Sequence, residues 1–252
     1  VISHHRLGSS TPMSASVMRL ALLPAFVHAF GTVGTIEPCK LVEPASTQID
    51  FEEFTRASWF VQEQEVTPLQ PLDQFFCVVA TYKLEGKVVQ VAGPPFGTGA
   101  PFDGTVISAY NQGNTGSVDG AKITQLGTEL CVRDLEPEGN RLAVAPCFLP
   151  NSLAGPYWPV VLKADKEGRY TAMAVINGQP TVPKSDGCGS PSESLGLFIL
   201  TRDRIAPPEL VKEIKAELVA LGISVAKLLP VTTEGCAFEG FDLKPSNETV
   251  IN

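Results

Sequence analysis

Short runs of apolar residues, separated by turn-forming residues, make up most of this chain. Clusters of glycine, proline, aspartate and asparagine break the pattern every eight to twelve residues or so. The apolar runs predict short strands at Phe75–Leu84, Lys87–Ala92, Thr105–Gln112, Ala121–Arg133, Asn140–Cys147, Tyr157–Leu162, Tyr170–Asn177 and Leu195–Arg202. Many short strands at this spacing are typical of an antiparallel sandwich or barrel.

One later segment has the period of a helix. Pro207 and Pro208 suit the first turn, where a missing N–H costs little. Gly222 suits the left-handed position that follows the last turn. Between them the apolar residues recur every three or four positions, at Leu210, Ile214, Leu218 and Leu221. The chain should therefore form one amphipathic helix that packs its apolar side against the strands.

The first 35 residues are predicted to form a leader. Arg19 precedes the apolar run Leu20–Val27, and Val27-His28-Ala29 resembles the small-residue cleavage site of a signal peptide. A retained hydrophobic anchor is the alternative, because extending the run to Ile36 approaches the ~20 residues that span a bilayer. The predicted domain covers residues 36–240 and a C-terminal tail covers residues 241–252.

Charge and cysteine usage narrow the function classes. The 252 residues carry a formal charge of −8, and the basic residues are scattered, which argues against a nucleic-acid partner. The six cysteines form no Cys-x-x-Cys pair and the three histidines all lie in the leader, so no metal site is expected. Six dispersed cysteines predict three disulfides in an oxidising compartment, extracellular or an organelle lumen such as the plastid thylakoid. Sequence alone leaves the pairing open.

Three stretches, in order, resemble the lipocalin family. Ala57-Ser58-Trp59-Phe60 is similar to the family's Gly-x-Trp opening, with Ala57 in place of glycine. Tyr157-Trp158 through Asp165, followed by Tyr170, resembles the second family motif, and Phe198–Arg202 before the helix resembles the third. The resemblance covers roughly Cys39–Cys236 and is closest to the apolipoprotein D and bacterial lipocalin branch. It implies an all-β fold, an eight-stranded antiparallel up-and-down barrel with one C-terminal α-helix packed outside.

The resemblance also implies roles for particular residues. Trp59 would lie under Arg202 and close one end of the barrel, a structural contact rather than a binding site. The disulfides would join Cys77 to Cys236 and Cys39 to Cys188, which leaves Cys131 with Cys147. Tyr82, Trp158 and Phe198 would line a pocket.

Strand alternation extends this set of interior residues. If Cys77 points outward, Val78 and Tyr82 point inward, and if Trp59 points inward, Val61 and Glu63 do too. The candidate ligand-binding residues are Val61, Glu63, Val78, Tyr82, Trp158, Val160 and Phe198. The alternative for the apolar members is that they only fill a core. Glu63 would either bind a ligand hydroxyl or reach solvent at the barrel mouth.

Two long connections depart from a minimal barrel of this family. Gly86–Asp103 is expected near the closed end, where a protein partner could bind. Asn177–Ser194 is predicted to be either a lid over the open end, held by Cys188, or a plain surface loop.

The expected function is binding, transport or protection of a small hydrophobic ligand, such as a carotenoid, retinoid, tetrapyrrole or lipid, with no required cofactor. Two alternatives remain. A barrel packed solid would favour a structural subunit of a membrane-associated assembly. An enzyme acting on a lipid or xanthophyll is disfavoured, because the domain has no odd cysteine and no histidine.

Overall fold

The structure of the protein is a computed structural model that describes residues 38–45, 48–90, 101–124, 130–136, 140–192 and 196–238. The chain divides into two units, Val1–Thr35 and Ile36–Asn252. The predicted leader, including Leu20–Val27, and the predicted tail at residues 241–252 lie outside the described residues.

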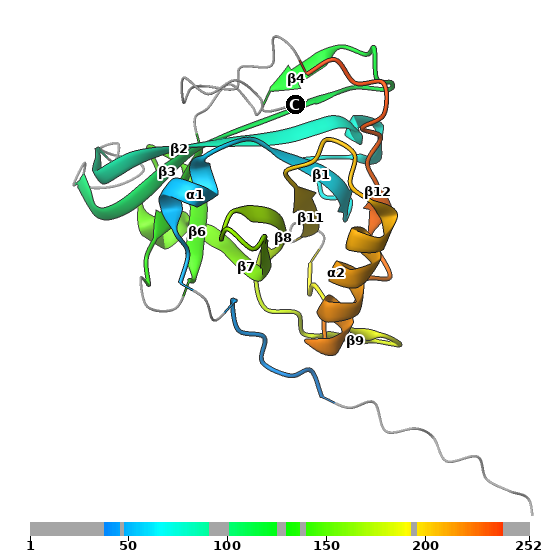
Figure 1. Ribbon diagram of the computed structural model, residues 1–252. Helices are drawn as coiled ribbons and strands as arrows, with labels where there is room; N and C mark the ends of the chain where they lie inside the picture. Colours follow the sequence, from blue (N-terminus) through cyan, green and yellow to red (C-terminus); the bar gives the residue numbers. More distant parts are fainter. Residues whose placement is uncertain are drawn as a thin grey trace, which may run out of the picture. The chain divides into compact units, whose positions relative to one another are not determined.

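Eight antiparallel strands of the described chain close into a barrel (Figure 1). They hydrogen-bond in chain order, and the last of them pairs back with the first, so the sheet has no open side. These strands are β1 (Trp59–Gln64), β2 (Phe76–Gln90), β3 (Pro101–Asn114), β5 (Leu130–Asp134), β6 (Leu142–Pro146), β7 (Gly155–Ala164), β8 (Tyr170–Ile176) and β11 (Leu197–Thr201). The predicted fold class is confirmed.

Shorter elements decorate the barrel. β4 (Lys122–Thr124) pairs with β3, and β12 (Leu229–Pro230) pairs with β1. β9 (Val182–Lys184) and β10 (Gly187–Gly189) form a separate hairpin. Two 3₁₀ turns, η1 (Leu72–Gln74) and η2 (Asn151–Leu153), lie in the connections after β1 and β6. The predicted insertion at residues 86–103 begins as a continuation of β2 and β3, which stay paired as far as Gln90 and Pro101; residues 91–100 lie outside the described ranges.

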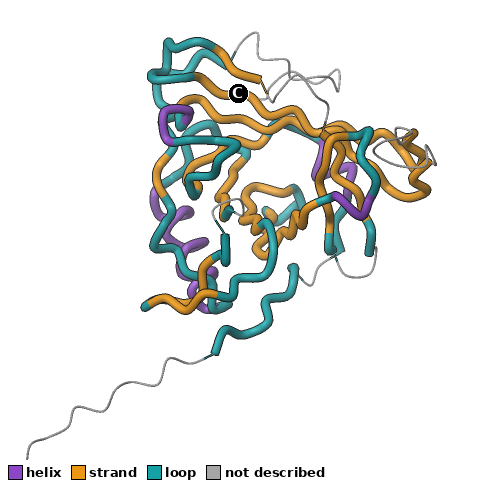
Figure 2. Tube along the Cα trace, turned by 180° about the vertical axis from the view of Figure 1, so that it is seen from behind, coloured by secondary structure: helices purple, strands orange, loops and turns teal. Residues whose placement is uncertain are grey.

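The predicted helix is α2 (Pro208–Ala220), which packs on the outside of the barrel (Figures 1 and 2). Ile214 and Leu218 are fully buried, and they belong to an outer apolar cluster that also includes Val161 and Ile199 from the barrel strands. Gly222 has φ +83° just after the helix, as the sequence predicts. None of the helices within the described ranges has both the length and the apolarity needed to cross a membrane.

One end of the barrel is closed by α1 (Phe51–Thr55) and by the contact between Trp59 and Arg202. Trp59 is fully buried and its indole Nε1 donates a 3.0 Å hydrogen bond to the Phe54 carbonyl. The Arg202 guanidinium lies 3.6 Å from the centre of the Trp59 ring. It also donates hydrogen bonds to four backbone carbonyls, those of Glu53, Phe54, Ala57 and Ser58. The structure thus places Trp59 and Arg202 together as a closure.

Three disulfides cross-link the chain, two of them between residues 149 and 159 positions apart and the third between residues 16 positions apart. Cys39 pairs with Cys188, Cys77 with Cys236, and Cys131 with Cys147, with Cα–Cα distances of 5.8, 5.5 and 4.8 Å. These are the pairs that the family resemblance implies. Three disulfides indicate that the protein folds in an oxidising compartment.

Candidate ligand-binding cavity

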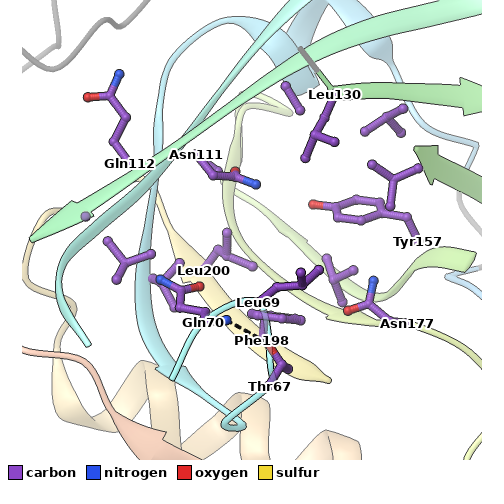
Figure 3. A pocket seen from close by; sticks show the side chains of 18 of the residues that line it. Thr67, Leu69, Gln70, Asn111, Gln112, Leu130, Tyr157, Asn177, Phe198 and Leu200 are labelled. Atoms are coloured by element: carbon purple, nitrogen blue, oxygen red, sulfur yellow. Dashed lines mark hydrogen bonds between the residues drawn. The ribbon is translucent and has the colours of Figure 1, made fainter. Parts of the chain in front are cut away.

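The barrel encloses a cavity of about 530 Å³ that opens opposite the closed end. This volume lies within the range of ~300–1,000 Å³ that is usual for small-molecule sites. The walls are mainly small and branched apolar side chains from the strands, among them Val61, Val78, Ala80, Ala109, Val132 and Leu200. Figure 3 labels Leu130 and Leu200 of the apolar lining. Their small size leaves room for this cavity between the walls of the barrel.

The polar groups that line this cavity are all uncharged. Of the described residues around it, none is Asp, Glu, Lys, Arg or His. Polarity comes instead from amides and hydroxyls, namely those of Thr67, Gln70, Gln74, Tyr82, Asn111, Gln112, Tyr157 and Asn177. In Figure 3 the Asn111 side chain points into the cavity, while Gln112 points away from it. The cavity therefore offers hydrogen bonds but no counter-ion.

Two tyrosines form the polar part of the cavity floor. The hydroxyl oxygens of Tyr82 on β2 and Tyr157 on β7 are 2.7 Å apart, a hydrogen bond in which either can donate. The Tyr82 ring packs against Phe54 of α1, with ring centres 5.1 Å apart, and so rests on the closed end. Burial raises the pKa of Tyr82 to about 12. Burial, together with the neighbouring Tyr82, also raises the pKa of Tyr157 well above its usual value. Both phenols are therefore neutral at physiological pH.

The connection between β1 and β2 forms one side of the mouth. Because β1 starts at the closed end with Trp59, the connection that follows it lies at the open end. Thr67 and Gln70 exchange backbone hydrogen bonds of 3.2 and 3.0 Å in a tight turn (Figure 3). Leu69, at the tip of that turn, lines the cavity and is 78% exposed. Leu69 therefore stands at the rim.

Four of the seven predicted ligand-binding residues line the cavity. Val61, Val78, Tyr82 and Phe198 all belong to the inner surface of the barrel. Their positions follow from regular alternation along β1, β2 and β11. Ligand binding by these residues stays a prediction.

Trp158 and Val160 do not face the interior, so that placement is wrong. Both belong to the outer cluster beneath α2, and the Arg141 guanidinium lies 5.6 Å from the centre of the Trp158 ring. The reason is a register shift between Pro159 and Val161, a β-bulge that adds one residue to β7. Tyr157 and Leu162 both reach the inner cluster although they are five positions apart. Sequence reasoning chose the wrong parity and missed Tyr157, which the second family motif includes.

The inward placement of Glu63 is wrong for the same kind of reason. The register of β1 shifts between Val61 and Glu63, which turns Glu63 to the outer surface. Its carboxylate accepts a 2.7 Å hydrogen bond from Lys215 Nζ on α2. Glu63 thus holds the helix to the barrel and does not contribute to the cavity.

The sequence predicts either a lid or a surface loop at Asn177–Ser194, and the described part of this segment does not form a lid over the cavity. Of the described residues in it, only Asn177 lines the cavity. The β9–β10 hairpin is tied to the segment after α2, with Cys188 exchanging backbone hydrogen bonds of 2.7 and 2.9 Å with Gly222 and Ser224. The Asp186 carboxylate accepts further bonds from Ser224 and Val225. Cys188 therefore fixes the β9–β10 hairpin against the segment that follows α2.

Within the described residues, no group of three or more His, Cys, Asp or Glu side chains is arranged to hold a metal ion.

Comparison with known proteins finds similarity among solved structures. Neither a protein-family model nor a curated protein matches the chain. Insecticyanin from the tobacco hornworm Manduca sexta is 14% identical over 77% of this chain and 85% of its own, with a TM-score of 0.47. H1 crustacyanin from the lobster Homarus americanus is 12% identical over 82% and 98%, with a TM-score of 0.45. The cockroach allergen Per a 4 is 13% identical over 80% and 96%, with a TM-score of 0.45.

The fold itself can be stated from this chain's own features. A closed barrel of eight antiparallel strands carries a Trp59–Arg202 closure at one end and a single helix, α2, on the outside. The resemblance to the apolipoprotein D branch stays a prediction. The protein has the lipocalin fold.

Proposed function

We propose that the protein binds, and thereby carries or protects, one small hydrophobic ligand that has no net charge. The observation that supports this is the cavity of about 530 Å³, apolar over most of its wall and lined by uncharged polar groups. Burial of apolar ligand surface supplies affinity, and a few amide or hydroxyl groups supply orientation. The three disulfides support an oxidising compartment for this activity, and we propose that it lies outside the cell or in an organelle lumen.

The sequence does not distinguish among several classes of hydrophobic ligand. A cavity lined by uncharged side chains favours some of these classes over others. A carboxylate moved into an apolar cavity without a cation loses its hydration and gains no ion pair, which costs several kcal/mol or forces it to bind a proton. Tetrapyrroles with free propionates and fatty acids carry such carboxylates. Neutral retinoids, carotenoids and lipid alcohols or ketones do not. We therefore favour the neutral group.

Two other functions receive less support from this geometry. A barrel packed solid by its own side chains would favour a structural subunit, whereas this barrel contains a cavity. The described lining has no carboxylate, imidazole, amine or thiol for acid–base or nucleophilic catalysis, and its hydroxyl groups, such as those of Tyr82 and Tyr157, have no such group beside them to activate them. Binding without reaction is the function we propose.

Retinol and retinoic acid test the proposal, because they share one carbon skeleton and differ in charge. Titration of the full chain at pH 7.5, followed by retinol fluorescence and by competition with retinoic acid, should show retinol binding at least about tenfold more tightly. Retinoic acid should gain affinity as the pH falls toward its own pKa. Absence of binding by every neutral apolar probe would refute the proposal, and tighter binding of the acid would refute the neutral preference.

A cavity-filling variant locates the bound ligand. Ala109 lies on the inner wall and is 2% exposed, so Ala109→Phe places a ring in the cavity. We expect retinol affinity to fall at least about tenfold as volume is lost. Ala164→Phe is the matched control, because Ala164 is exposed at the end of β7 away from the mouth. Equal affinity for both variants would place the ligand elsewhere.

A further inference from the structure

The Tyr82–Tyr157 pair spans the interior of the barrel. In the closed ring of strands, β2 and β7 are separated by β3, β5 and β6 on one side and by β1, β11 and β8 on the other. They are therefore opposite walls, and the 2.7 Å hydrogen bond between the two hydroxyls crosses the space between them. In Figure 3 the Tyr157 side chain reaches into the cavity with its hydroxyl toward the centre.

The two tyrosine hydroxyls together have one hydrogen that the bond between them does not use. Each tyrosine hydroxyl has one hydrogen to donate and lone pairs to accept with. One hydroxyl hydrogen is used in the bond between the two side chains. The hydrogen of the accepting hydroxyl then has no acceptor among the described residues, although Tyr82 is only 4% exposed. A buried donor without an acceptor is unfavourable, so the site calls for an oxygen from another molecule.

The surroundings decide which kind of oxygen fits. Both phenols are kept in the neutral form, since burial raises the pKa of each. Nearby lining residues such as Ala80, Ala109 and Val132 are apolar and offer the pair no competing acceptor in their side chains. A neutral oxygen can accept the spare hydrogen at this position without bringing a charge into the cavity. If the ligand group is a hydroxyl, its O–H can also donate to a lone pair on one of the two phenol oxygens.

We propose that the Tyr82–Tyr157 pair is the anchor for a terminal hydroxyl or carbonyl oxygen of the ligand. The ligand would enter with its oxygenated end first and leave its hydrocarbon part toward Leu69 at the rim. The inference rests on the proposed function and makes it more specific. It assigns the ligand to the neutral, terminally oxygenated lipids or isoprenoids and gives it one orientation.

The test compares three probes of one skeleton on the full chain. Retinol and retinal carry a terminal oxygen, and the corresponding hydrocarbon, axerophthene, lacks it. Replacing both hydroxyls with hydrogen in a Tyr82→Phe, Tyr157→Phe double variant should weaken retinol and retinal by about tenfold. Axerophthene affinity should stay within about twofold, because the apolar contacts remain. A single replacement is less informative, since the remaining hydroxyl can still donate.

The matched control is Tyr170→Phe. The Tyr170 hydroxyl accepts a hydrogen bond from the Asp50 N–H at the closed end and does not line the cavity. This variant removes a tyrosine hydroxyl with a structural role and should not change the preference for oxygenated probes. Its thermal unfolding, measured beside that of the double variant, shows how much stability a hydroxyl loss costs by itself.

The outcomes separate the anchor from the binding function. Equal weakening of all three probes, or of none, overturns the anchor while leaving hydrophobic binding intact. Failure of wild-type protein to bind any of the three probes overturns both proposals.

A second measurement covers the case of a double variant that does not fold. The C=O stretch of retinal bound to wild-type protein should lie at lower frequency than that of retinal in an alkane, and an unshifted band overturns the anchor.

Discussion

The closed end of this barrel and its cavity differ in how far their polar groups are paired within the protein. At the closed end, the Arg202 guanidinium donates to four backbone carbonyls and covers the Trp59 ring, whose N–H is itself bonded. Inside the cavity, the tyrosine pair keeps one hydroxyl hydrogen without a protein acceptor, and at the rim Leu69 is 78% exposed. At the closed end the Arg202 Nε is buried without a partner, but both terminal nitrogens of the guanidinium are bonded. A polar network that is nearly complete supports stability, whereas groups left unpaired in a cavity are available to a ligand. The largest stability effects should therefore come from the closed end.

Removing Arg202 should have the largest effect. Arg202→Leu removes a donor from four backbone carbonyls, of which only those of Glu53 and Phe54 keep another one, from the Arg56 N–H and the Trp59 indole. It also removes the cation from the Trp59 face, so we expect the free energy of unfolding to fall by about 3–5 kcal/mol. Burial and the nearby Arg56 lower the pKa of Arg202 to about 9, which still leaves it charged at neutral pH. Urea unfolding at pH 7 measures the loss.

Arg56→Leu is the control for this prediction. Arg56 is at the same end of the barrel, but its side chain is 28% exposed and pairs, at 2.9 Å, with Glu53 three residues earlier in the chain. Partly exposed ion pairs of this kind contribute at most about 1 kcal/mol. Similar losses for the two variants would show that the carbonyl network at Arg202 is not what stabilises the closed end.

The tyrosine pair gives a smaller effect that depends on pH. In the unfolded chain tyrosine ionises near pH 10, whereas burial keeps Tyr82 protonated to about pH 12. Between these values the folded state holds more protons, so its stability falls as the pH rises. Two pKa units correspond to about 2–3 kcal/mol for Tyr82, and Tyr157 acts in the same direction.

The measurement compares wild-type protein with the Tyr82→Phe, Tyr157→Phe variant from pH 9 to pH 12. The lowered pKa of Arg202 acts with the opposite sign, because there the unfolded state holds the additional proton. Arg202 is present in both proteins, so the burial that lowers its pKa, the largest cause, is common to them, and only the smaller mutual effect of Arg202 and Tyr82 enters the difference. Unfolding free energies that decline in parallel would mean that the phenols ionise as freely in the folded barrel as in the unfolded chain.

Sequence was informative where the strands are regular. Trp59 and Val61 alternate inward on β1, and Val78 and Tyr82 do so on β2, as a two-residue period requires. Beyond the bulges the rule fails, because one additional residue reverses the parity of every later position until the strand ends. Glu63 follows the bulge in β1. Trp158 lies before the bulge in β7 and therefore does not share the inner face of Leu162, which follows it.

Other features of the site depend on contacts that no local pattern records. The hydrogen bond between Tyr82 and Tyr157 joins residues 75 positions apart on opposite walls. The position of the β9–β10 hairpin depends on the backbone of Gly222 and Ser224, which follow the end of α2 and bond to Cys188. The absence of charged side chains from the described lining follows from which residues turn inward. Glu63 was predicted to be inside, but it turns outward and bonds to Lys215.

The rim offers the smallest and most local comparison. Leu69 and Leu72 belong to the same connection and are 78% and 56% exposed, but only Leu69 lines the cavity. Leu69→Ser and Leu72→Ser should each change the free energy of unfolding by less than about 0.5 kcal/mol, as exposed substitutions usually do. Leu69→Ser should also weaken retinol by about threefold, because it removes apolar contact with the end of the ligand at the mouth. Leu72→Ser should leave retinol affinity unchanged. Equal weakening by both variants would indicate a general change in the connection, and no weakening by either would mean that the ligand ends below the rim.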